Sequence, residues 1–145
     1  MAMLPEGMEM YFKNTPKKVF LGGTCNGSTW RDELIPMLKI DYFNPVVEEW
    51  TAEAQRIEEL EKLRASHQLY VITPKMTGMF SIAEAVDMSN KNPRSLVFMV
   101  MWEDGEKRFD EHQKKSLQAV SELIRLNGGH VCYDLIQVAN LLNKE

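Results

Sequence analysis

Cysteine is scarce in this chain of 145 residues, and the two that occur are far apart. They are Cys25 and Cys132, and no Cys-x-x-Cys pair is present. The three histidines (His67, His112 and His130) are scattered and form no ligand cluster with the cysteines. This pattern argues against a disulfide framework and against a zinc site, so we expect no metal, no cofactor and a reducing, cytoplasmic compartment.

Long hydrophobic runs are missing as well. The longest run, residues 96–102, is far shorter than the roughly 20 apolar residues of a membrane-spanning helix. Residues 1–14 contain several methionines but lack the basic and apolar regions of a signal peptide. A net charge of −4 gives no reason to expect a nucleic acid polymer or a membrane as partner. We predict a flexible N-terminal arm over residues 1–17 and a single domain over residues 18–145.

Short strand patterns alternate with helical patterns along that domain. Strands are predicted at residues 18–23, 39–43, 68–73, 95–102 and 131–133, and an exit turn is predicted at residues 103–105. Helices are predicted at residues 29–38, 50–65, 111–126 and 135–142, and a turn at residue 77 leads into another that ends between residues 88 and 92. This alternation predicts parallel βαβ units with right-handed crossovers. The predicted class is therefore α/β, a three-layer, flavodoxin- or Rossmann-like domain with a five-stranded, mostly parallel sheet.

The helix predicted at residues 50–65 has the strongest pattern, and Thr51 is placed to begin it. The residues near one of its faces are mostly apolar: Ala54, Ile57, Leu60, Leu63 and Arg64. Charged residues cover its other faces: Glu53, Glu58, Glu61 and Lys62. The pattern predicts an amphipathic helix with one apolar face and charged residues on its other faces.

The first predicted strand runs directly into a glycine-rich stretch, residues 22–28. Backbone N–H groups at such a strand-to-helix turn attract anions, although a turn that only needs glycine's freedom has the same composition. Gly22 and Gly27 have the Walker A spacing, but Ser28 stands where that motif requires lysine, so a nucleoside triphosphatase is not expected. The residues predicted to bind a sugar or a single phosphate are Gly22, Gly23, Thr24, Asn26 and Ser28.

A second stretch, residues 77–84, places polar groups where a helix begins. In a structural interpretation, Ser81-x-x-Glu84 is a capping box in which both side chains only satisfy the helix N-terminus. In a functional interpretation, Gly78 allows close backbone approach while Ser81 and Glu84 face a bound ligand. Two further candidate binding residues are Asn44, directly after the second predicted strand, and Trp30, although tryptophan is more often a packing residue than a ligand contact.

Several of these stretches occur in one order along the chain: residues 19–24 with Trp30-Arg-Asp-Glu33, then Asp41-Tyr-Phe-Asn-Pro45, Gln55 to Glu59, and Ser81-Ile-Ala-Glu84. Together they resemble the nucleoside 2-deoxyribosyltransferase-like family over residues 18–101. The resemblance implies N-glycosidic chemistry on a 2-deoxynucleoside or its 5′-monophosphate. It also implies a small-molecule nucleoside or nucleotide as partner and a homo-oligomer, for which the helix at residues 50–65 or the N-terminal arm is the candidate interface.

The resemblance also implies roles for individual residues. Glu84 matches the nucleophile that attacks the anomeric carbon, releases the base and leaves a glycosyl ester. Ser81 matches the hydroxyl residue that helps to hold a 5′-phosphate, and Gly22 and Gly23 match the backbone beside the sugar. A carboxylate is a suitable nucleophile for such an oxocarbenium-like centre, and a general acid for the leaving base is also expected.

The chain departs from the family pattern at two positions. Thr73 stands where the general acid is typically an aspartate, and Phe20 stands where many members have a tyrosine that orients the glutamate. The nearest substitutes in sequence are Asp41, Tyr42, Glu48 and Glu49. Three hypotheses follow: a glycosyl-transferring or glycosyl-hydrolysing enzyme, a non-catalytic nucleotide-binding module, and an interaction domain in which the Ser81–Glu84 pair only caps a helix.

Overall fold

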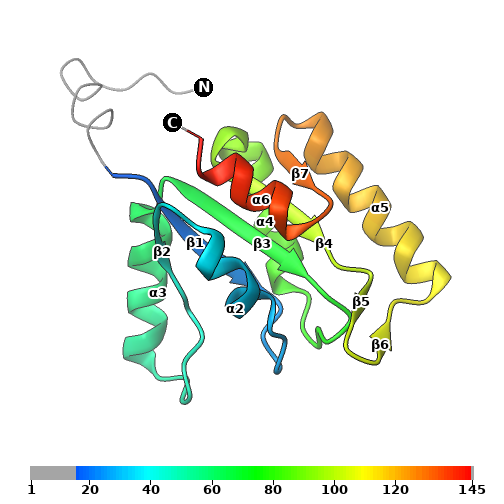
Figure 1. The fold of residues 1–145 in the computed structure, drawn as a ribbon, viewed down its shortest axis with the longest axis horizontal. Helices are drawn as coiled ribbons and strands as arrows, with labels where there is room; N and C mark the ends of the chain where they lie inside the picture. Colours follow the sequence, from blue (N-terminus) through cyan, green and yellow to red (C-terminus); the bar gives the residue numbers. More distant parts are fainter. Residues whose placement is uncertain (1–15, 145) are drawn as a thin grey trace.

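Residues 16–144, which the computed structural model describes, form one parallel sheet with helices on both faces (Figure 1). The strands are β1 (Lys18–Gly23), β2 (Asp41–Phe43), β3 (His67–Ile72), β4 (Leu96–Val100) and β7 (His130–Cys132). Their order across the sheet is β2-β1-β3-β4-β7, and every neighbouring pair is parallel. The predicted α/β, three-layer, Rossmann-like class is confirmed. Most of the predicted N-terminal arm lies outside the described residues.

The helices are α2 (Trp30–Leu34), α3 (Ala52–Arg64), α4 (Phe80–Lys91), α5 (Glu111–Leu126) and α6 (Leu135–Leu142). One core layer packs α2 and α6 on the sheet: Val19, Leu21, Trp30, Leu34, Leu69, Val71, Val97, Met99, Cys132, Val138, Ala139 and Leu142. The other packs α4 and α5 on the opposite face: Tyr70, Ile72, Ala85, Leu96, Phe98, Val100, Phe109, Leu117 and Ile124. None of the helices in residues 16–144 combines the length and the apolar composition needed to cross a bilayer.

Local signals explain where several elements begin and end. Pro36 lies in a 3₁₀ turn (Ile35–Met37) that finishes the α2 segment, because proline lacks the N–H that an α-helix interior needs. The Asp110 side chain caps α5 and accepts from the N–H of Gln113 at 2.7 Å. Asp134 caps α6 in the same way, through the N–H of Gln137. Both helices therefore have the bounds predicted from the sequence.

Two local expectations need correction. The exit turn after β4 is a small antiparallel hairpin, β5 (Glu103–Asp104) with β6 (Lys107–Arg108). The N-cap of α4 is Met79, and no side chain caps this helix, so the capping-box interpretation of Ser81 and Glu84 is wrong.

Helix α3 lies beside β1 and β2 (Figure 1). Thr51 does cap it, accepting from the N–H of Ala54 at 3.0 Å. The apolar face is not buried, however, and the Leu63 side chain is 84% exposed. The charged side chains of Glu58 and Lys62, in contrast, are only 21% exposed each. Part of the charged face of α3 therefore turns inward, where Glu58 lines a cavity that is described below.

Candidate functional site

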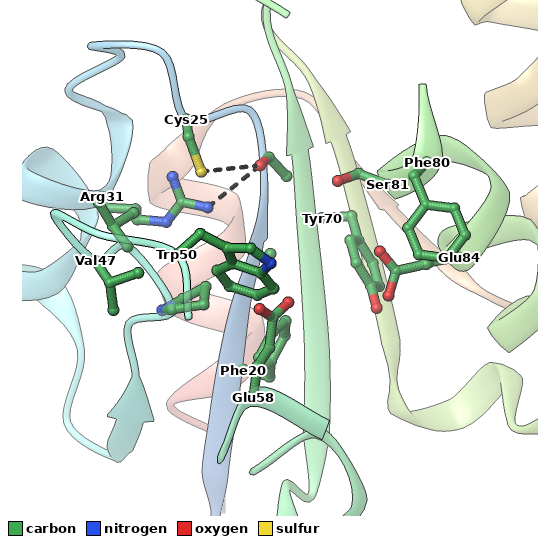
Figure 2. A pocket seen from close by; sticks show the side chains of 14 residues that line it. Phe20, Cys25, Arg31, Val47, Trp50, Glu58, Tyr70, Phe80, Ser81 and Glu84 are labelled. Atoms are coloured by element: carbon green, nitrogen blue, oxygen red, sulfur yellow. Dashed lines mark hydrogen bonds between the residues drawn. The ribbon is translucent and has the colours of Figure 1, made fainter. Parts of the chain in front are cut away.

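The strand order creates a switch point beside β1, where the connection from β1 crosses one face of the sheet and that from β3 crosses the other. Ligands of open parallel sheets bind at such points, beyond the carboxyl ends of the strands. A cavity of about 320 Å³, here called the main cavity, lies there (Figure 2). Its lining residues are Phe20, Gly22, Gly23, Cys25, Arg31, Pro45, Val46, Val47, Trp50, Glu58, Tyr70, Phe80, Ser81 and Glu84.

A smaller cavity of about 200 Å³, here called the side cavity, adjoins the main cavity. The two share Gly23, Cys25, Phe80 and Ser81. Small polar residues and backbone line much of the remainder of the side cavity, together with Ile72 and Met76: Thr24, Asn26, Thr77 and Gly78. One elongated ligand therefore has room for a larger group in the main cavity and a smaller polar group in the side cavity.

The Glu84 carboxylate in the main cavity is held by a lysine from the neighbouring helix. Lys62 of α3 donates to Oε2 of Glu84 on α4, and the same ammonium group lies 3.5 Å from Oε1 of Glu58. The side chains of Lys62 and Glu84 are 21% and 19% exposed. One cation therefore bridges two carboxylates, and Oε1 of Glu84 is the oxygen that Lys62 does not bind.

A buried tyrosine lies next to these carboxylates. Tyr70 of β3 is 2% exposed, and its hydroxyl donates to Oε1 of Gln68 at 2.9 Å. Burial, followed by the negative charges of Glu84 and Glu58, raises the pKa of Tyr70 far above that of a free tyrosine. The phenol therefore stays neutral and serves the cavity as a fixed hydroxyl group.

Arg31 brings a positive charge to the main cavity and is only 4% exposed. Its Nε donates to the carbonyl of Leu21 at 3.0 Å, and its terminal nitrogens donate to Thr24 at 2.8 Å and Gly23 at 3.4 Å. The guanidinium also lies 4.3 Å from the ring centre of Trp30. Burial is the main cause of a lowered pKa at Arg31. No carboxylate in residues 16–144 forms an ion pair with it.

A family model for nucleoside 2-deoxyribosyltransferase-like proteins matches residues 16–109, well over half of the chain. The chain belongs to the nucleoside 2-deoxyribosyltransferase-like family. The match includes every residue that lines either cavity and confirms the resemblance inferred from the sequence. No curated protein and no solved structure matches the chain significantly. Membership supports a small nucleoside as the kind of substrate for this family domain.

The two glycines that end β1 are required by close packing against β3. A Cβ on Gly22 would lie 2.7 Å from the ring of Tyr70. Gly23 has a φ of +110°, and a Cβ there would lie 2.1 Å from the carbonyl oxygen of Val71. The backbone at this point is therefore bare where it lines the main cavity.

Three predicted binding residues lie outside both cavities in the described chain. Ser28 donates to Oδ2 of Asp104 at 2.6 Å and ties the first loop to β5. Trp30 is fully buried, and its indole N–H donates to the carbonyl of Thr24 at 2.9 Å. The Asn44 side chain accepts from the N–H of Val46 at 3.1 Å. Each of these side chains shapes a loop that surrounds the site.

Asp104 is the anchor for that first loop. Burial alone would raise its pKa, but hydrogen bonds from Ser28 and Thr73 and the nearby Lys75 outweigh burial, so the pKa of Asp104 is lowered. Lys75 Nζ lies 3.6 Å from the carboxylate. The loop after β1 and the loop after β3 are therefore joined through one ionised side chain.

The remaining predicted binding residues gather at the side cavity. Asn26 has a φ of 44° and donates to the carbonyl of Lys75 at 3.1 Å and to Oγ1 of Thr77 at 3.0 Å. Thr24 accepts from the N–H of Thr73 at 3.0 Å. These bonds hold the first loop against the entrance to α4, where Gly78 and Ser81 lie.

Neither the family's usual acid position nor the substitutes proposed from the sequence supply a carboxylate to the cavity. Thr73 is fully buried. None of the four substitutes lines either cavity: Asp41, Tyr42, Glu48 and Glu49. Four polar side chains at or beside the main cavity were not predicted as site residues from the sequence: Arg31, Glu58, Lys62 and Tyr70. Arg31 and Glu58 lie inside stretches that carry the family resemblance, and that resemblance is the sequence signal that could have identified them.

Proposed function

We propose that this protein cleaves the N-glycosidic bond of a 2-deoxynucleoside or its 5′-monophosphate, with Glu84 as the nucleophile. The observation that supports this proposal best is the position of Glu84, which lines the main cavity with one oxygen held by Lys62. Oε1 attacks the anomeric carbon of the deoxyribose, and the sugar is held as a glycosyl ester. Water then releases the sugar, or a second nucleobase accepts it.

The shape of the two cavities suggests how such a substrate lies. The base occupies the main cavity, whose rim carries the exposed aromatic side chains of Trp50 and Phe80. The 5′ end of the sugar points toward the side cavity, past the Ser81 hydroxyl and the backbone of Gly78. The bare backbone of Gly22 and Gly23 lies beside the sugar between them.

A chromatographic assay of released base tests the proposal directly. The wild type is incubated with a panel of deoxynucleosides and their 5′-monophosphates, with and without an acceptor base. Glu84→Gln is expected to abolish base release, whereas Asp87→Asn, on the same helix and exposed, keeps it. Dependence on the acceptor base separates a transferase from a hydrolase. Base release by a folded Glu84→Gln protein would contradict the role given to Glu84.

A second candidate function is nucleotide binding without turnover. It is favoured by Thr73, which places no carboxylate at the family's acid position. This alternative predicts saturable binding of a deoxynucleotide in calorimetry, together with no base release during prolonged incubation.

We also propose that the protein is a cytoplasmic homo-oligomer. The exposed apolar side chains of α3 support an interface there: Ile57, Leu60 and Leu63. The two cysteines are free thiols, which fits a reducing compartment. Light scattering during gel filtration tests the assembly, and Leu63→Glu is expected to shift it toward the monomer.

A further inference from the structure

The chemistry of glycosidic cleavage leaves one requirement that Glu84 does not meet. When the bond between C1′ and the base breaks, its electron pair moves onto the base, and that charge must be stabilised. Among the described residues that line the main cavity, Arg31 is the cationic one. Figure 2 shows its guanidinium next to Cys25, across the drawn pocket from Ser81 and Glu84.

The contacts of Arg31 fix its orientation without neutralising its charge. Its guanidinium donates hydrogen bonds to three backbone carbonyls, those of Leu21, Gly23 and Thr24. It forms no ion pair with a carboxylate in residues 16–144. These bonds leave one N–H on each terminal nitrogen without a backbone partner. A buried cation held in place by carbonyls and by the Trp30 ring is preorganised for an anionic group in the cavity.

We propose that Arg31 stabilises the departing base as an anion, in place of a general acid. This inference rests on the proposed function. The bond from Glu84 Oε1 to C1′ forms while the bond from C1′ to the base nitrogen breaks, and the electron pair leaves with the base. Arg31 donates a hydrogen bond to an acceptor atom of that base, which takes a proton from water after it departs. In the second step a water oxygen attacks C1′, the ester electron pair returns to Glu84, and the proton goes to solvent.

The other polar side chains of the main cavity fit this role less well. An arginine does not give up its proton, so it stabilises charge without acting as an acid. Tyr70 donates its hydroxyl hydrogen to Gln68. The Glu58 carboxylate lies 3.5 Å from the Lys62 ammonium group, on the side of the main cavity that α3 forms. Acceptor atoms such as O2 of a pyrimidine or O6 and N7 of a purine suit the planar guanidinium.

The substrate class follows from the same argument. A base that leaves as an anion leaves faster when its own N–H is more acidic. We therefore expect 2′-deoxyuridine to react faster than 2′-deoxycytidine, and 2′-deoxyinosine faster than 2′-deoxyadenosine. Within one base, 5-fluoro-2′-deoxyuridine should react faster than 2′-deoxyuridine, since fluorine acidifies the ring with little change in size.

The test measures single-turnover base release from 5-substituted 2′-deoxyuridines of graded acidity. The wild type is compared with Arg31→Met, Arg31→Lys, Glu58→Gln and, as a matched control, Arg56→Met on the exposed face of α3. Arg31→Met should slow release of uracil about 100-fold, the usual effect of losing one charge-stabilising donor. It should slow release of 5-fluorouracil less, because the more acidic base needs less help. Glu58→Gln and Arg56→Met should keep the wild-type dependence on acidity.

Each contrary outcome has a separate meaning. Equal slowing of every substrate by Arg31→Met would overturn the proposal and leave Arg31 with a structural role. A wild-type rate independent of base acidity would overturn it too, and this readout decides the matter if the Arg31 variants do not fold. If the rate of base release by Glu58→Gln depended more steeply on base acidity than the wild-type rate, Glu58 would be the general acid that protonates the leaving base, which would overturn the proposal. In these three cases the proposed function stands, whereas no base release by the wild type would overturn both.

Discussion

Gly23 at the end of β1 matters to both the fold and the candidate site because it carries no Cβ atom. Its φ of +110° costs an alanine about 1–3 kcal/mol, the usual strain of such a backbone conformation. A Cβ would also lie 2.1 Å from the carbonyl oxygen of Val71. Since that oxygen is backbone, β1 and β3 must separate, which weakens the 2.8 Å bond from the N–H of Thr24 to Val71.

We therefore expect Gly23→Ala to lower the free energy of unfolding by about 3–5 kcal/mol, the sum of backbone strain and a displaced buried hydrogen bond. Two other glycines serve as matched controls. Gly27 has a φ of +78° but open space around its Cβ position, so Gly27→Ala should cost only about 1–2 kcal/mol. Gly78 has neither constraint, and Gly78→Ala should change stability by less than about 0.5 kcal/mol.

Urea unfolding followed by tryptophan fluorescence measures this series, because the fully buried Trp30 reports directly on the layer beneath β1. The order of destabilisation should be Gly23→Ala, then Gly27→Ala, then Gly78→Ala. If Gly23→Ala cost no more than Gly27→Ala, the close approach of β1 and β3 would not be what requires glycine, and the reasoning would be refuted.

Three further outcomes follow from the charges around the site. A double-mutant cycle of Lys62→Met and Glu84→Gln should give a coupling of about 1–2 kcal/mol in urea unfolding, since the pair is largely shielded from solvent; a coupling near zero would contradict the observed bridge. Asp104→Asn should cost about 1–2 kcal/mol at pH 7. Because folding lowers the pKa of Asp104, its carboxylate stabilises the fold at pH values above its pKa in the unfolded state, which is near 4. This stabilisation is lost as the pH falls through the pKa of the folded state, so the stabilities of Asp104→Asn and the wild type should converge in acid unfolding titrations. In hydrogen-exchange mass spectrometry, α3 should exchange faster than β3 because it has no fully buried residue, and a bound deoxynucleotide should slow it; equal protection in the free protein would contradict this.

The sequence predicted the sheet and its helices well because their signals are local. Glycine closes β1, Pro36 ends the α2 segment, and aspartates at 110 and 134 begin the last two helices. Each of these signals acts within a few residues of the element that it limits. The β5–β6 hairpin was read as a plain turn because its strands have only two residues each.

The sequence was ambiguous where the local pattern fits two arrangements. The periodicity of α3 separates an apolar face from a charged face but does not say which one meets the neighbouring structure. Here Glu58 and Lys62 turn toward the cavity, and Leu63 remains exposed. The Ser81-x-x-Glu84 spacing likewise fits a capping box or a site, and only the helix start after Met79 separates the two.

The parts of the candidate site that are continuous in sequence could be predicted, but the residues that strand pairing brings together could not. The glycine-rich loop and the start of α4 could be found because each is one continuous stretch. Arg31 and Tyr70 line the same cavity because α2 follows β1 and because β1 pairs with β3, with Gly22 beside Tyr70 in the strand register. No spacing in the sequence encodes that pairing, so the residues that depend on it were missed.

The departures at Phe20 and Thr73 therefore carry less weight against catalysis than their positions in the sequence suggest. Phe20 removes a hydroxyl from β1, but Tyr70 brings one to the same cavity from β3, close enough to Glu84 for that carboxylate to raise its pKa. Thr73 removes a carboxylate from the end of β3, but the cavity holds a second carboxylate, Glu58, and a buried cation, Arg31. Chemistry depends on which groups share a cavity and not on which strand carries them. An assay of base release is therefore a fair test of this protein, even though two family positions are changed.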